Sequence, residues 1–137
     1  MGSLTHLLAQ TNTYLTTIPG LRPILAATIP GEIGDIHRFA RLSQLIAYAG
    51  HQSGQFHATH THLSKRGSVY LRRAVWMAAQ VARQHDPELQ ALYARKCSQH
   101  KHPSVAIGAV CHRLLTRIYV VLKEQRPHIV HNKPANT

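Results

Sequence analysis

The chain has 137 residues, with 16 Lys and Arg against 5 Asp and Glu, so its formal charge is 16 − 5 = +11 at neutral pH. Its length and its 44% of hydrophobic residues suit one domain with a single core, and its apolar runs are too short to cross a bilayer. The surplus positive charge indicates nucleic acid as a partner first and an anionic membrane surface second.

The N-terminal third predicts short helices separated by proline and glycine. Residues 3–17 carry leucines at helical spacing, and residues 24–29 form an apolar helix that we expect to end at Pro30-Gly31. Asp35 is expected to cap a turn through residues 37–39. Residues 43–49 indicate a further helix, ending at Gly50.

A long, polar and basic loop over residues 51–67 is expected to precede the central helix. Loops of this length inside a compact domain are usually functional or disordered. From Ser68 the helical pattern returns, and its buried face is predicted at four positions: Leu71, Val75, Ala78 and Ala82.

Two more helices complete a predicted all-α fold without strands. Asp86 is the expected N-cap and Pro87 the first residue of a short amphipathic helix, and residues 104–124 form the longest helix. We expect one domain over residues 1–126 and a disordered tail over residues 127–137.

The turn at residues 18–23, Ile-Pro-Gly-Leu-Arg-Pro, resembles the helix-hairpin-helix DNA-binding motif. In that motif a glycine turn points backbone N–H groups at a phosphate. Gly20 and Arg22 are therefore candidate nucleic-acid-binding residues, with Arg22 standing where the motif has its second glycine. The alternative is a plain corner between two helices.

A cluster of positive charge marks the end of the long loop and the start of the central helix. Its members are Lys65, Arg66, Arg72 and Arg73. Ser53, beside Gly54, is a candidate nucleophile, since nearby cations would stabilise the charge that develops on an attacked phosphodiester. The alternative is that Ser53 is an ordinary loop serine, and Ser64 is better interpreted as capping the basic turn.

The sequence predicts no metal or other cofactor in this chain. The loop histidines lack a nearby cysteine, and the five acidic residues are scattered, so a solvated loop is preferred over a zinc site. Cys97 and Cys111 form no CxxC pair, and two reduced thiols are preferred over a disulfide. With no signal-peptide pattern at the N-terminus, the expected location is the cytoplasm.

Taken in order, six sequence blocks resemble the C-terminal transposase domain of the IS110 insertion-sequence family, also called IS116 or IS902 and related to the Piv recombinase. The blocks lie at residues 18–27, 32–39, 47–50, 52–54, 63–74 and 101–109. The resemblance runs from about residue 15 to residue 124. Between the third and fourth blocks, the family has several more residues than the single His51 found here.

The resemblance implies DNA transposition through cleavage and rejoining of DNA strands, guided by an RNA that the element encodes, in a homo-oligomer. It places the catalytic serine at Ser53 and the family's basic pattern at residues 65, 66, 72 and 73. It also implies a separate RuvC-like domain whose acidic residues hold Mg²⁺. That domain is not part of this sequence, so we expect a transposase fragment that is inactive alone. A non-catalytic helix-hairpin-helix module is the alternative.

Overall fold

The structure, a computed structural model, describes residue 11, residues 13–50, residues 67–99 and residues 102–128. Within these ranges every regular element is helical, which confirms the all-α prediction. The elements are α2 (Pro23–Ile33), the 3₁₀-helix η1 (Ile36–Arg38), α3 (Leu42–Tyr48), α5 (Val69–His85), α6 (Pro87–Ser98) and α7 (Pro103–Glu124).

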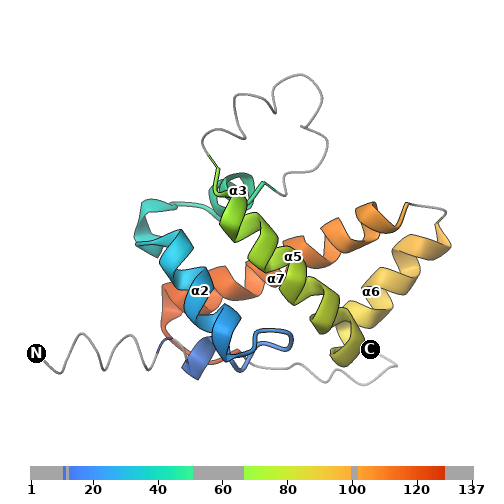
Figure 1. The fold of residues 1–137 in the computed structure, drawn as a ribbon, viewed down its shortest axis with the longest axis horizontal. Helices are drawn as coiled ribbons and strands as arrows, with labels where there is room; N and C mark the ends of the chain where they lie inside the picture. The colour runs from blue at the N-terminus through green and yellow to red at the C-terminus, as the bar shows by residue number, and fades with distance from the viewer. Residues whose placement is uncertain (1–10, 12, 51–66, 100–101, 129–137) are drawn as a thin grey trace, which may run out of the picture.

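Three helices pack on one another to form the centre of the fold. Helix α5 lies across α7, and α6 packs against both, while α2 lies along the other side of α5 (Figure 1). Helix α3 and η1 contact α7. The core is a continuous set of aliphatic side chains, including Leu15, Ile29, Ile33, Leu45, Leu71, Val75, Leu89, Leu114, Leu115 and Ile118.

Helix α5 buries the face that its sequence pattern predicts. Leu71, Val75, Ala78 and Ala82 are fully buried, as are most of the apolar residues of α7. Helix α7 is also long and apolar enough, by length and composition, to cross a membrane. Since 56% of its most apolar window is buried by the rest of the fold, packing in the core accounts for that composition.

The predicted helix boundaries hold wherever a side chain caps them. The Asp35 carboxylate accepts a hydrogen bond from the His37 N–H at 2.9 Å. The Asp86 carboxylate accepts hydrogen bonds from the N–H groups of Glu88 and Leu89 at the start of α6. Pro87 occupies the first turn, where its missing N–H costs nothing.

The expected end of α2 at Pro30-Gly31 is wrong. The helix continues through both residues to Ile33, and the Pro30 carbonyl accepts a hydrogen bond from the Gly34 N–H at 2.9 Å. Ile29 and Ile33 are both fully buried, so core packing on either side of Pro30 offsets the hydrogen bond that proline removes. The helix ends at Gly34, whose φ of 74° is left-handed.

Three expectations concern residues outside the described ranges: most of the helix at 3–17, the loop at 51–66 and most of the tail at 127–137. The described start of the chain contacts the end of α7. The Thr11 hydroxyl donates to Gln125 Oε1 at 3.2 Å, and the His128 N–H donates to Thr17 Oγ1 at 2.8 Å. The two cysteines are unpaired thiols, as expected.

Candidate nucleic-acid interface

The residues that flank the segment 51–66 meet between α3 and α5. The Ser68 N–H donates to the Tyr48 carbonyl at 2.9 Å, which links the chain just after the segment to the chain just before it. A Cβ added to Gly67 would lie 2.6 Å from the same carbonyl, so only glycine allows this approach. We refer to residues 48–50 together with residues 67–68 as the stem.

A carboxylate from α2 joins the stem. The Ser68 hydroxyl donates to Glu32 Oε1 at 3.1 Å and accepts the Leu71 N–H at 3.0 Å, so it also caps α5. The Tyr48 hydroxyl donates to the Glu32 carbonyl at 3.4 Å. The ends of α2 and α3 and the start of α5 are therefore held together by one polar cluster.

Aromatic packing fixes the position of α3. The Arg38 guanidinium lies 4.6 Å from the ring centroid of Phe39 and 4.6 Å from that of Tyr48, and its Nε donates to the Ile33 carbonyl at 3.1 Å. Its charge thus serves the fold, between η1 and α3, rather than a ligand.

Arg72 lies against the stem. A Cβ built on Gly50 would meet Arg72 Cδ at 3.0 Å, and the φ of Gly50 is 75°. The Arg72 charge also acts on Cys111 of α7, where burial is the larger influence and raises the pKa of the thiol to about 12. Cys111 is therefore a neutral core side chain and not a thiolate nucleophile.

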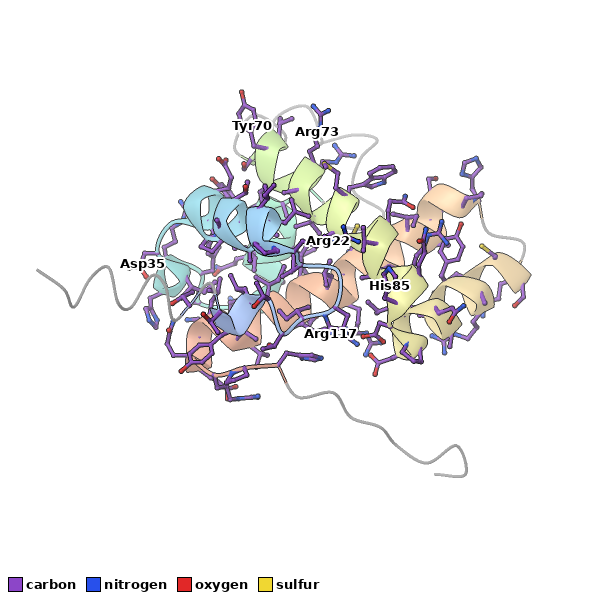
Figure 2. The ribbon with its side chains drawn as sticks, turned by 60° about the horizontal axis from the view of Figure 1, so that its bottom comes forward. Arg22, Asp35, Tyr70, Arg73, His85 and Arg117 are labelled. Carbon is purple, nitrogen blue, oxygen red and sulfur yellow. The ribbon has the colours of Figure 1, made fainter. Side chains whose placement is uncertain are left out.

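Arg22 and Arg73 are both exposed cations near α5. Figure 2 shows Arg73 near the start of α5, Arg22 beside its middle and His85 at its end. Neither guanidinium makes a hydrogen bond or an ion pair within the described ranges. Both are available to an anionic ligand.

The turn that bears Arg22 packs directly on α5. Gly20 has a φ of 97°, and a Cβ at this position would lie 2.6 Å from the Ala78 carbonyl oxygen and 2.6 Å from the Ala82 Cβ. The glycine is therefore required for close packing. Arg22 is the N-cap residue of α2 and remains exposed.

The acidic residues do not counter these cations. Asp86 and Glu88 both pair with Arg117, at 2.6 Å and 3.0 Å, and Glu124 pairs with Arg126 at 2.7 Å. Across the described part of the chain, no three His, Cys, Asp or Glu side chains converge as metal ligands. The described residues therefore do not fit a Mg²⁺ site.

Of the predicted site residues, the structure brings four to α5. Arg72 and Arg73 lie in its first turns, and Gly20 lies against its second half, with Arg22 two residues further along the same turn. Ser53, Lys65 and Arg66 lie outside the described residues.

The sequence interpretation missed three large side chains on the outer face of α5: Tyr70, Trp76 and Met77, which are exposed together. The missed signal was the position of these residues opposite the predicted core face of the same helix.

The fold and this surface define the class of the protein: an all-helical domain with a cationic, carboxylate-poor face along one helix. A family model described as "Transposase IS116/IS110/IS902 family" matches residues 12–94, which is more than half of the chain. The chain therefore belongs to this family of insertion-sequence transposases, which confirms the resemblance seen in its sequence blocks.

A curated relative found by a separate comparison is also an insertion-sequence transposase. The chain is 27% identical over 120 residues to the transposase for insertion sequence element IS1111A of Coxiella burnetii (strain RSA 493 / Nine Mile phase I). The match covers 82% of this chain and 33% of that transposase. The chain thus spans about a third of the length of this relative.

Proposed function

We propose that this chain is the nucleic-acid-binding part of an insertion-sequence transposase and that it carries a serine nucleophile for cleavage and rejoining of DNA strands. The observation that supports this most directly is the stem. It joins both ends of the segment that contains Ser53, Lys65 and Arg66, beside the arginines that begin α5.

Chain connectivity limits how far these groups lie from the stem. Ser53 is three residues from Gly50, so their Cα atoms are at most about 11 Å apart. Arg66 directly precedes Gly67, about 3.8 Å away between Cα atoms. These limits along the chain are what link the Ser53 hydroxyl and the basic residues to the stem in this proposal.

In the proposed reaction the Ser53 Oγ attacks the scissile phosphorus. A serine–phosphate bond forms, the bond to the leaving deoxyribose oxygen breaks, and that oxygen takes up a proton while the serine hydroxyl loses one to a base. Arg72 and Arg73, together with Lys65 and Arg66, would stabilise the added negative charge. Attack by another strand's hydroxyl reverses the step and rejoins the DNA.

A complete enzyme needs groups that the described residues do not supply. Mg²⁺, which would stabilise the phosphorane charge, is assigned in this proposal to acidic residues outside this sequence. A guide RNA and a homo-oligomeric assembly remain parts of the same proposal. The chain alone is expected to bind DNA and to cleave it poorly.

The test is a covalent protein–DNA band on a denaturing gel. The full chain is incubated with nicked or junction DNA and Mg²⁺, with and without the N-terminal part of a longer family member added in trans. We expect a band that Ser53→Ala abolishes and Ser64→Ala, a matched change in the same segment, retains. A covalent band that persists in the Ser53→Ala variant would overturn the assignment of Ser53 as the nucleophile.

The second candidate is a non-catalytic binding module, favoured by Arg22 and Arg73, which are exposed and make no ion pair or hydrogen bond among the described residues. It predicts no covalent band under any condition. Its DNA affinity would fall with salt and with Arg73→Gln but would not respond to Ser53→Ala.

A further inference from the structure

The outer face of α5 exposes four large hydrophobic side chains around one arginine. Val69, Tyr70, Trp76 and Met77 are 68%, 73%, 48% and 47% exposed. They stand four and three residues before Arg73 and three and four residues after it, so all four neighbour it on the helix surface. We call these five residues the α5 patch.

Four neighbouring hydrophobic side chains are unusual on a surface that contacts only solvent. Isolated exposed hydrophobic residues are normal, but a contiguous apolar group marks a binding site. The opposite face of α5 supplies the core contacts, so the patch is not needed to hold the helix in the fold.

Charge selects an anionic occupant. Helix α5 contains no Asp or Glu, and Arg73 is unpaired within the described ranges. A second copy of the chain fits poorly, because two-fold packing of α5 on α5 through the patch centre would oppose Arg73 to its own copy.

The rings select the kind of anion. Tyr70 and Trp76 lie about one helical turn before and after Arg73, so an aromatic residue stands on each side of the arginine along the helix. Tyr70 and Arg73 project into open space from the first turns of α5 (Figure 2). Aromatic rings alternating with arginine are the features with which proteins bind single-stranded nucleic acid.

We propose that the α5 patch binds unpaired nucleotides, with bases stacked on Tyr70 and Trp76 and a phosphate on Arg73. This inference rests on the proposed function and narrows it, because bases inside an intact duplex have no free face for stacking. The strand is either melted DNA or RNA, since both present the same bases and phosphates.

Trp76 provides a direct reporter, because it is the single tryptophan in the chain. The full chain is titrated with single strands of about 12 nucleotides, as DNA and as RNA, and with duplex DNA of equal phosphate number. Saturation with a single strand is expected to quench the Trp76 fluorescence, whereas duplex changes it little. The stronger of the DNA and RNA arms identifies the source of the strand.

Substitution separates stacking from general charge. Tyr70→Leu is expected to weaken single-strand binding by about five-fold or more and duplex binding by less than about two-fold, whereas Tyr70→Phe retains single-strand affinity. Val105→Ala, at another half-exposed hydrophobic position, on α7, is the matched control. Circular dichroism of each variant verifies the fold.

Two results would overturn the inference and leave the proposed function standing. One is unchanged Trp76 fluorescence when anisotropy shows the single strand bound; the other is equal weakening of duplex and single strand by Tyr70→Leu. A Trp76 change produced only by self-association or by a protein partner also overturns it. Absence of binding to any nucleic acid would instead overturn the proposed function.

Discussion

Arg117 places a charged guanidinium in the core, so it requires a charged partner that is also buried. It is 9% exposed and pairs at 2.6 Å with Asp86, which is 4% exposed (Figure 2 labels Arg117). The second oxygen of the Asp86 carboxylate caps α6. One carboxylate therefore fixes the corner between α5 and α6 and ties it to α7.

Loss of this carboxylate is predicted to be severe. Asp86→Ala should lower the free energy of unfolding by about 3–5 kcal/mol, because it leaves Arg117 buried with only Glu88 as a partner. Asp86→Ser restores a capping hydroxyl and should recover only about 1 kcal/mol of that loss. Urea denaturation of the three proteins measures both contributions.

The matched control is the outer partner of the same arginine. Glu88 is 54% exposed, so Glu88→Ala should cost about 1 kcal/mol or less. Equal losses at Asp86 and Glu88 would contradict the assignment of Asp86 as the buried partner.

At the residue scale, the sequence predicted interactions between residues that are close together in the chain. Asp86 and Asp35 were predicted as caps because the cap signal lies within three residues of the side chain. The Arg117 pair was not predicted, because 31 residues separate its members and only the packing of α6 on α7 brings them together.

At the scale of elements, the contact between the 18–22 turn and α5 organises the N-terminal part of the fold. Ile18 and Leu21 are buried on either side of Gly20, and Gly20 itself lies on the Ala78 and Ala82 backbone. Two small residues on α5 thus accommodate a turn that has no side chain at its closest point. This contact sets where Arg22 lies along α5.

Two glycines of this region should respond oppositely to alanine. Gly20→Ala combines a left-handed φ with a Cβ at 2.6 Å from α5 and should destabilise the protein by at least about 2 kcal/mol. Gly31→Ala has no atom within 4 Å and lies inside α2, where it should stabilise by up to about 1 kcal/mol. The melting temperatures of both variants measure these effects. A Gly20→Ala variant as stable as the original protein would contradict the close contact between Gly20 and α5.

Element types were predicted well because hydrophobic spacing is strong in α5 and α7. The end of α2 was missed because Pro30-Gly31 is a typical stop signal, and only the tertiary burial of Ile33 overrides it. The functional role of the helix-hairpin-helix-like turn remains a prediction.

At the scale of the whole molecule, the distribution of charge matters more than its sum. Three of the five carboxylates form ion pairs with Arg117 or Arg126. A fourth, that of Glu32, accepts a hydrogen bond from the Ser68 hydroxyl. Few carboxylates of the chain are therefore left to neutralise the positive charge along α5. A polyanion is the partner that such a surface attracts.

The salt dependence of DNA affinity tests this distribution. Arg73→Gln and Arg22→Gln should each reduce the slope of log Kd against log salt by about 1, the value for one lost phosphate contact. Arg126→Gln removes the same unit of charge from a residue already paired with Glu124, and it should leave the slope nearly unchanged. Equal effects of all three changes would show that net charge alone governs binding.

The cationic character of the site and its place at the start of α5 were predictable, because Arg72 and Arg73 are adjacent in the sequence. The approach of the 18–22 turn to α5 was not, since it depends on two alanines more than fifty positions away. The role of Ser53 stays a prediction.

The stem has a consequence for how members of this family can diverge. The stretch between Gly50 and Gly67 is flanked by Tyr48 and Ser68, which share a hydrogen bond, so its length is decoupled from the packing of the helices. Because closure entropy grows only by about 0.6 kcal/mol for each doubling of length, residues can be inserted or deleted there at little cost to stability. Members of this family can therefore differ in the length of this stretch without a change in the packing of the helices.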